Sequence, residues 1–287
     1  MIRTRDPSHV KASNNDDDFW LQFTEYLLKS VSNDTAKYRL SCAKKYCHVL
    51  LEENATDLLR LSNDKRIHVM KSLSNLAKFL GCYNKWKSII DRYQLKWSNE
   101  NGVDTFNKIL NGKYDYSSML DWLKQAYQTL PERYGNALLF NSLTGLRPKE
   151  ACESIKIIQS DIDEYLIKDT MFLEHFRFPD IFIRRTKNAY ISIVSEKILD
   201  IAKQANKITY TSVKLAIKRR GVEMHMNYCR KIFATYLRSK GIEQEIIDLL
   251  QGRIPKNIFV RHYYKPDVRS FNRIREILNE LYTVIIQ

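Results

Sequence analysis

The chain has no long apolar run and no closely spaced pair of cysteines. Its apolar runs, such as IFI at 181 and YISIV at 190, are far shorter than the ~20 residues that a membrane-spanning helix needs. No apolar segment follows the N-terminal charges, so we expect no signal peptide and a soluble, cytoplasmic protein. The five cysteines are scattered without a CxxC pair. This pattern indicates reduced, mostly buried thiols and neither a disulfide framework nor a zinc site.

Positive charge is what the chain has in excess. It carries 47 Lys and Arg against 33 Asp and Glu, a net charge of +14. This balance favours a polyanionic partner, because Lys and Arg neutralise phosphates and release their counterions. Charge alone does not choose DNA over RNA, and a ribosomal or simply basic protein would show the same excess. The 287 residues are 44% hydrophobic, which excludes a disordered protein and allows one large domain or two of ordinary size.

The pattern of apolar residues predicts two domains. Residues 1–17 are predicted to be a flexible tail. Over residues 18–110 the apolar positions recur every three and four residues, which predicts a helical bundle. The segment 111–117 opens with Asn-Gly, a chain-breaking pair, and is predicted to be a linker. The second domain then covers residues 118–287.

The second domain is predicted to be α+β. Its two ends have helical periodicity, but EYLIKD, IFIRR and AYISIV, after residue 160, are short and rich in β-formers. The last two flank Thr186-Lys187-Asn188 as the strands of a hairpin would. Helices around one small antiparallel sheet give an α+β domain, so the whole chain is predicted to be mainly α with a small antiparallel sheet.

The segment LTGLRPKEA is the first candidate site. Gly145 is placed to end one helix and Pro148 to begin the next, so Arg147 falls at a helix cap beside backbone N–H groups that favour an anion. Glu150 is placed either to brace the guanidinium or to cap the helix. The alternative is a purely structural helix junction.

Three further places carry candidate residues. Lys187 falls at the tip of the predicted hairpin, where a solvated lysine is equally common. Arg230 lies near the start of a helix, where a phosphate contact and a surface salt bridge are both open. Arg253 follows a helix end in LLQGR, and the pair Tyr263 and Tyr264 comes shortly after it. A tyrosine pair of this kind often serves packing alone.

Taken in order, these places resemble the catalytic domain of the tyrosine recombinases, the phage-integrase family. TGLRPKEA looks like the first arginine box, TGxRxxE, and Lys187 matches the β-hairpin lysine. Asn227 to Arg230 stands where the family has HxxR, LLQGR stands where it has LLGH, and the tyrosine box follows. The resemblance covers about residues 118–287, while residues 18–110 look like the helical core-binding domain that clamps DNA.

The chain departs from the family pattern at two histidines. Asn227 replaces the histidine of the second box and Arg253 that of the third. Arg253, with the RHYYKP ending, resembles the integrases of archaeal fuselloviruses and related plasmids. Because arginine stays protonated, Arg253 is able to hold a phosphate oxygen and unable to act as a base. His262 is placed either to replace part of the lost imidazole function or to pair with backbone or DNA.

The resemblance implies a site-specific recombinase that cuts and rejoins double-stranded DNA through a 3′-phosphotyrosyl intermediate. Tyr263 sits at the distance from the third box at which the family carries its nucleophile. Arg147, Arg230 and Arg253 would hold the non-bridging phosphate oxygens, and Lys187 would protonate the departing 5′ oxygen. Neither a metal nor another cofactor is implied. By the same resemblance the protein would act as a homotetramer on DNA, integrating a viral or plasmid genome.

Two other functions remain open. A type IB-like topoisomerase uses the same constellation to relax DNA, and a protein that has lost catalysis would only bind DNA. The C-terminal stretch has helical spacing of its apolar residues and would pack either on its own domain or on a neighbouring protomer. Five more cations are possible phosphate contacts or merely solvated charges: Lys44, Lys45, Lys218, Arg219 and Arg220.

Overall fold

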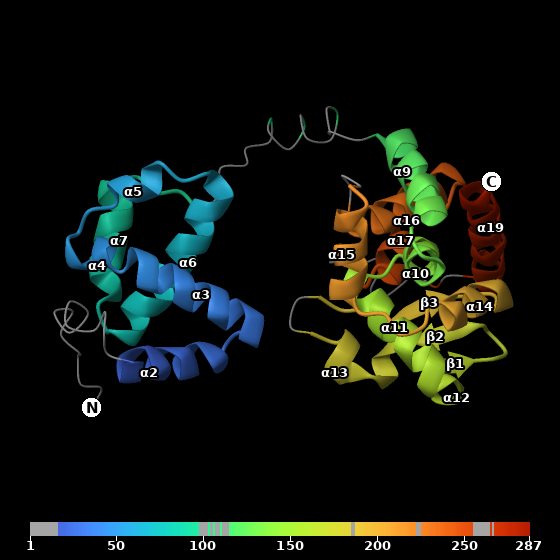
Figure 1. The fold of residues 1–287 in the computed structure, drawn as a ribbon, viewed down its shortest axis with the longest axis horizontal. Coiled ribbons are helices and arrows are strands. Elements are labelled where there is room, and N and C mark those ends of the chain that lie inside the picture. The colour runs from blue at the N-terminus through green and yellow to red at the C-terminus, as the bar shows by residue number, and fades with distance from the viewer. Residues whose placement is uncertain are drawn as a thin grey trace. The chain divides into compact units, whose positions relative to one another are not determined.

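The computed structural model divides the chain into two compact units, Met1–Asn111 and Gly112–Gln287, each with its own apolar core (Figure 1). The structure describes residues 17–97, 103, 106, 110, 115–184, 187–221, 225–254, 265 and 267–287. Most of the predicted tail 1–17 and of the predicted linker 111–117 therefore lies outside the described residues.

The described part of the first unit is built from helices. The helix α3 packs along α6, and α2 contacts both of them. Apolar residues spaced along these helices and along α7, among them Phe23, Leu73 and Trp86, are completely buried. The elements are α2 (Asp17–Leu28), α3 (Asn33–Tyr46), α4 (His48–Leu51), α5 (Thr56–Leu59), α6 (Asn63–Phe79) and α7 (Tyr83–Arg92).

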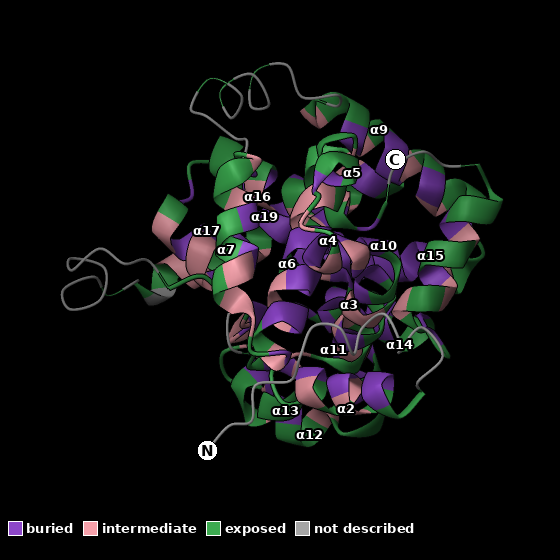
Figure 2. Ribbon diagram, turned by 90° about the vertical axis from the view of Figure 1, so that its left-hand side faces the viewer, coloured by how far each residue is buried: buried purple, intermediate pink, exposed green. Residues whose placement is uncertain are grey.

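The second unit is organised around the helix α10 (Glu132–Thr144), which is buried along all of its length from Gly135 onward. The helices α9, α11, α14 and α16 pack around it, and Figure 2 shows buried residues on the inward faces of the helices. These and the other helices are α9 (Tyr116–Thr129), α11 (Pro148–Ser160), α12 (Ile162–Tyr165), η2 (His175–Arg177), α13 (Pro179–Phe182), α14 (Glu196–Gln204), α15 (Tyr210–Arg219), α16 (Asn227–Ser239), α17 (Gln244–Leu250) and α19 (Val268–Ile286).

The second unit also contains a small antiparallel sheet in the order β1-β2-β3. Its strands are β1 (Leu166–Ile167), β2 (Phe172–Glu174) and β3 (Ile191–Ile193). In the register of the sheet, Leu166 pairs with Leu173 and Phe172 pairs with Ile193. The prediction of a mainly helical chain with a small antiparallel sheet is confirmed.

The predicted strand IFIRR is wrong. Residues Pro179–Phe182 form the helix α13, and beyond it an isolated antiparallel bridge joins Ile183 to Asn188. Pro179 supplies a backbone angle suited to the first turn of a helix, and the helical turn carries Phe182 into the core. A short apolar run does not by itself distinguish strand from helix. The strand that pairs with β3 is instead β2.

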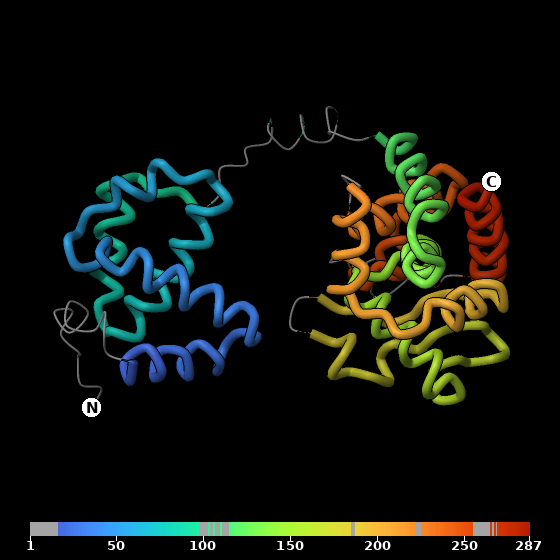
Figure 3. Tube along the Cα trace, in the orientation of Figure 1, coloured from blue at the N-terminus to red at the C-terminus, as the bar shows by residue number. Residues whose placement is uncertain are grey.

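Within the single chain the C-terminal helix α19 packs on its own unit, which is one of the two alternatives that the sequence left open. It contacts α9, α10, α16 and β3, as its course in Figure 3 shows. The Arg275 guanidinium donates to the carbonyl oxygens of Thr170 at 2.7 Å and Val194 at 3.1 Å. The buried apolar residues of this helix are Ile274, Ile277, Leu278, Leu281 and Ile285. In the described part of the chain, no helix combines the length and the apolar character that crossing a membrane requires.

Candidate active site

The junction between α10 and α11 holds the first arginine box in place. Gly145 ends α10 with φ +66°, and its N–H donates to the Asn141 carbonyl at 3.0 Å. A Cβ at position 145 would lie 2.4 Å from the Phe233 ring, so only glycine fits both the backbone angle and the space. The Asn141 amide nitrogen donates to the Leu146 carbonyl at 2.7 Å. These contacts hold the backbone in place immediately before Arg147.

Arg147 is the N-cap of α11, and Glu150 fulfils both of the roles that the sequence suggested for it. The Glu150 carboxylate accepts from the Arg147 backbone N–H at 3.0 Å and from the Arg147 Nη1 at 3.1 and 3.3 Å. Glu150 is only 2% exposed, whereas the Arg147 side chain is 24% exposed. Arg147 Nη1 also donates to the Asn188 carbonyl at 2.9 Å. The guanidinium is thus held from the protein side and open on the other.

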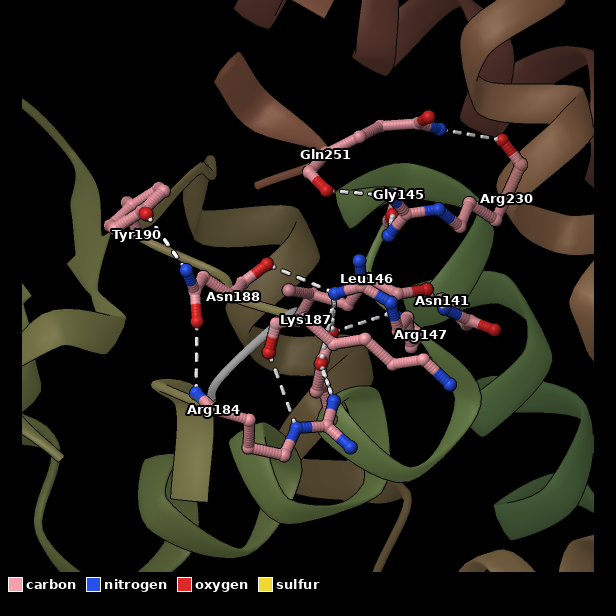
Figure 4. Close-up of polar contacts among 11 residues, drawn as sticks. Asn141, Gly145, Leu146, Arg147, Arg184, Lys187, Asn188, Tyr190, Arg230 and Gln251 are labelled. Carbon is pink, nitrogen blue, oxygen red and sulfur yellow. Dashed lines mark hydrogen bonds and ion pairs between the residues drawn. The ribbon is translucent and has the colours of Figure 1, made fainter. Parts of the chain in front are cut away.

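The chain segment between Arg184 and Tyr190 brings Lys187 to the same place (Figure 4). The Arg184 guanidinium forms a close ion pair with Glu150 and donates through Nε to the Lys187 carbonyl at 3.3 Å. The Asn188 side chain closes this turn, since its oxygen accepts from the Arg184 backbone N–H at 2.8 Å and its nitrogen donates to the Tyr190 hydroxyl at 3.0 Å. Lys187 itself is exposed, and its ammonium has no ion pair among the described residues.

Arg230 projects from α16 and is held by backbone carbonyls. Its Nη1 donates to the Gly145 carbonyl at 3.0 Å and its Nη2 to the Gln251 carbonyl at 2.6 Å. The Gln251 side chain, which is buried, donates in return to the Arg230 carbonyl at 2.9 Å. A surface salt bridge, which the sequence left open for Arg230, is therefore absent from its contacts with described residues. Arg230 instead joins the first arginine box to the end of α17.

Arg253 follows the end of α17. Gly252 has φ +69°, and the Arg253 N–H donates to the Asp248 carbonyl at 2.7 Å, which closes the helix. Arg253 Nη1 pairs with the Asp248 carboxylate at 3.1 Å, while 58% of the arginine side chain stays exposed. A Cβ at Gly252 would lie 1.7 Å from the Asn188 carbonyl oxygen. The end of α17 therefore lies directly against the segment that carries Lys187.

The three arginines interact electrostatically. The pKa of Arg230 is lowered to about 10, first by burial and then by the positive charges of Arg147 and Arg253, while Glu150 and Asp248 act in the opposite direction. Positive charges that come together in a partly buried place repel one another, and a bound anion would relieve the repulsion. Planar guanidinium groups match the oxygens of a phosphate in geometry and charge.

The other predicted residues are distributed more widely. Asn227 is exposed at the start of α16, one helical turn before Arg230 and therefore on the same face. Lys44 and Lys45 lie in the last turn of α3 in the first unit, where their ammonium groups stand over the rings of Trp20 and Tyr46. Three cations lie at the C-terminal end of α15: Lys218, Arg219 and Arg220. Three predicted residues lie outside the described part of the chain: His262, Tyr263 and Tyr264.

Some residues that build this site were missed from the sequence. Arg184 and Asn188 connect Lys187 to the first arginine box, while Gln251 holds Arg230 and Asp248 holds Arg253. Gln251 lies inside the LLQGR box, so the candidate segment in the sequence already pointed to this residue. No periodicity or spacing pairs Arg184 with Glu150, because the two are far apart along the chain.

Comparison with known families places the chain in a family. A family profile described as archaeal phage integrase matches residues 120–277, which include every segment of the site described above. The protein is an integrase-type recombinase that acts on DNA, and it belongs to the archaeal phage integrase family. The resemblance to phage integrases is thereby confirmed. No curated protein matches the chain.

Proposed function

We propose that this integrase cuts and rejoins DNA as a tyrosine recombinase and inserts a viral or plasmid genome into a host chromosome. The observation that carries the proposal is the cluster of Arg147, Arg230 and Arg253, in which burial and then the positive charges of the other two arginines lower the pKa of Arg230 to about 10. The α10–α11 junction, the helix α16 and the end of α17, which are far apart in sequence, converge on it. Such a cluster has the charge and the donors that a phosphodiester requires.

The hydrogen bonds of the arginines leave donors for a phosphate. A guanidinium has five N–H donors. Arg147 uses Nη1 for Glu150 and Asn188, which leaves Nε and Nη2 available within the described part of the chain. Arg230 uses one N–H of each Nη for the carbonyl oxygens of Gly145 and Gln251. The protein therefore orients both forks before DNA arrives, which lowers the cost of organising them in the transition state.

The proposed cleavage step is an in-line displacement at phosphorus. The phenol oxygen of Tyr263 forms a bond to phosphorus while the bond from phosphorus to the 5′ oxygen breaks. The electron pair of that bond leaves with the 5′ oxygen, which takes a proton from the Lys187 ammonium, and the phenol proton passes to solvent. Rejoining runs the same step backwards. The phosphotyrosyl ester keeps the energy of the broken bond, so the proposed cycle draws on neither a nucleotide nor a metal.

The remaining predicted residues complete the proposal. Asn227 shares the Arg230 face of α16 and is proposed to contact the phosphate in place of the missing histidine. His262 directly precedes Tyr263 in the sequence. Residues 18–110 are proposed to clamp the DNA as a core-binding domain, and residues 118–287 to carry the chemistry. The proposed DNA contacts outside the site are Lys44, Lys45, Lys218, Arg219 and Arg220. The protein would work in the cytoplasm of the host cell, as a homotetramer on paired attachment sites.

A suicide-substrate experiment tests the proposal. A duplex that the protein binds tightly, selected from random-sequence DNA, is nicked near the cleavage point so that cleavage traps the covalent adduct. We expect the wild-type protein and the Tyr264→Phe variant to give a protein–DNA band on a denaturing gel, and the Tyr263→Phe variant to give none. Loss of the band only with Tyr264→Phe would leave the chemistry in place and move the nucleophile by one residue.

Assays of plasmid relaxation, DNA binding and strand exchange separate the alternatives. Relaxation of supercoiled plasmids that lack the selected site would favour a type IB-like topoisomerase, because a recombinase needs paired sites. A wild-type protein that binds the selected duplex without forming the adduct would support a protein that only binds DNA. The adduct together with strand exchange between two site-bearing duplexes supports the integrase.

A further inference from the structure

Arg184 forms the side-chain link between Lys187 and the first arginine box. Its Nη2 forms the ion pair with Glu150, and its Nε donates to the Lys187 carbonyl at 3.3 Å (Figure 4). Glu150 in turn accepts from Arg147 Nη1 at 3.1 Å. A continuous chain of polar contacts therefore runs from Arg147 through a buried carboxylate and Arg184 to the backbone of Lys187.

The burial of Glu150 indicates that Arg184 is there for more than charge balance. Glu150 is 2% exposed, and Arg147 alone already gives this carboxylate one positive partner and three hydrogen bonds. A second guanidinium at the same carboxylate repels the first and loses part of its hydration. Arg184 nevertheless turns its fork inward, although 42% of its side chain remains exposed. Only a planar fork holds the carboxylate and the Lys187 carbonyl at the same time, which an ammonium group does not do.

Asn188 strengthens the same link from the next position. Its carbonyl accepts from Arg147 Nη1 at 2.9 Å, and its side-chain oxygen accepts from the Arg184 N–H at 2.8 Å. The Lys187 carbonyl and the residue that follows it are thus tied to the arginine box, the first through Arg184 and the second through the Asn188 carbonyl. The backbone position of Lys187, whose side chain is exposed, is set by these two ties.

We propose that Arg184 is a positioning residue for proton transfer, which holds the Lys187 ammonium at the 5′ leaving oxygen of a phosphate bound by Arg147. The inference rests on the proposed role of Lys187 as proton donor and deepens it. Arg184 touches neither the phosphate nor the leaving oxygen and acts through the Lys187 backbone. A displacement of about 1 Å at a reacting group costs about 10²-fold in rate, so loss of Arg184 should slow cleavage without abolishing it.

A sulfur substitution at the leaving group distinguishes a defect in proton delivery from a purely structural defect, because only the former is rescued in the cleavage rate. In a duplex with sulfur in place of the bridging 5′ oxygen, the phosphorus–sulfur bond breaks and the electron pair leaves as a thiolate. A thiol has a pKa of about 8.5, so this leaving group departs without a proton. Any defect in proton delivery is therefore bypassed, whereas a defect in phosphate binding or folding persists.

The experiment compares single-turnover cleavage of the oxygen and sulfur duplexes by wild type and variants. We expect Arg184→Ala to slow the oxygen substrate by about 10²-fold and Lys187→Ala by about 10²–10⁴-fold. Both should return to near the wild-type rate on the sulfur substrate. Arg184→Lys keeps the charge beside Glu150 but not the contact to the carbonyl, so it should behave like Arg184→Ala. Arg147→Ala should stay slow on both substrates.

Two controls keep the result interpretable. Arg177→Ala removes another partly exposed arginine that pairs with a carboxylate, Glu174 at 2.5 Å, and should cleave both substrates like wild type. Thermal unfolding of Arg184→Ala should stay close to that of wild type, because Glu150 keeps its bonds to Arg147. Equal slowing of Arg184→Ala on both substrates, or no slowing on the oxygen substrate, would overturn the inference. Failure of sulfur to rescue Lys187→Ala would overturn the proposed proton donor, and the inference with it.

Discussion

The α-carbon of Gly252 lies against the carbonyl oxygen of Asn188, so closely that a Cβ at position 252 would be 1.7 Å from that oxygen. The same carbonyl accepts from Arg147 Nη1 at 2.9 Å. Three segments that are separate in the sequence therefore meet at one atom: the first arginine box, the segment that carries Lys187, and the end of α17. The relative placement of the proposed phosphate-binding and proton-donating groups depends on this contact.

Substitution of Gly252 should cost more stability and more cleavage activity than the strain of its left-handed backbone angle alone. Gly252 and Gly221 both have φ +69°, but a Cβ at Gly221 would meet nothing within 4 Å. Gly221→Ala should therefore cost only the left-handed strain, about 1–2 kcal/mol. Gly252→Ala must in addition push the Asn188 carbonyl away, so we expect a larger loss of stability in denaturant titrations and a marked loss of covalent adduct. Equal losses of stability and normal cleavage by both variants would contradict this.

The arginine cluster should bind a small phosphate in the absence of DNA. Repulsion of Arg230 by Arg147 and Arg253 is relieved when an anion binds. A ligand that binds only the folded state at about ten times its Kd stabilises by about 1.4 kcal/mol. We expect inorganic phosphate to raise the Tm of the wild-type protein in differential scanning calorimetry at constant ionic strength.

The Arg230→Ala variant is the matched comparison for phosphate binding. It removes one cation of the cluster and leaves the carbonyl oxygens of Gly145 and Gln251 without this donor, which should itself cost about 1–3 kcal/mol. Its Tm should respond much less to phosphate. A phosphate effect of the same size in both proteins would indicate general salt stabilisation, and the cluster would not be an anion site.

Acid should destabilise the second unit through His175. This imidazole is fully buried between Tyr165, at 2.5 Å from Nδ1, and Ser192, at 2.8 Å from Nε2, and burial lowers its pKa from 6.5 to about 3. Below about pH 6.5 the unfolded chain takes up a proton here that the folded protein does not. The contribution is therefore fully present above pH 6.5 and is lost as the pH falls towards 3, by up to about 1.4 kcal/mol per pH unit.

Replacement of His175 isolates this contribution from that of the carboxylates. The His175→Gln variant should be less stable than wild type at neutral pH, because the two hydrogen bonds are disturbed. Its free energy of unfolding should fall less steeply between pH 6 and 4, by about one bound proton. The exposed His225, replaced in the same way, serves as the comparison. Parallel slopes in His175→Gln and wild type would mean that His175 does not titrate on unfolding.

The C-terminal helix should contribute to the stability of a single chain. Leu281 of α19 is completely buried in the core of the second unit, whereas Ile286 is 39% exposed. Leu281→Ala should cost about 2–5 kcal/mol and Ile286→Ala about 0.5 kcal/mol, measured by denaturant unfolding. The wild-type midpoint should not depend on protein concentration, because α19 packs on its own unit. A midpoint that rises with concentration would indicate exchange of the helix between protomers.

The prediction from sequence succeeded where local rules apply. The glycine at 145 and the proline at 148 marked the helix junction at Arg147, and the structure has φ +66° and an N-cap at these positions. The strand prediction failed at IFIRR, where local β-propensity competed with a proline-initiated helical turn that buries Phe182. The role of Glu150 was left between two alternatives, and the structure shows both because the carboxylate has two oxygens to share.

By itself the sequence determined the class of the protein, since the order Arg147, Lys187, Arg230, Arg253 is a property of the chain and does not depend on how the chain packs. It also determined helix ends, because capping depends on residues next to one another. Only the tertiary structure decided that Arg184 pairs with Glu150, that Asn188 lies against Gly252 and that α19 packs on its own unit. These contacts join residues distant along the chain, and they exist only because close packing of the cores brings the segments together.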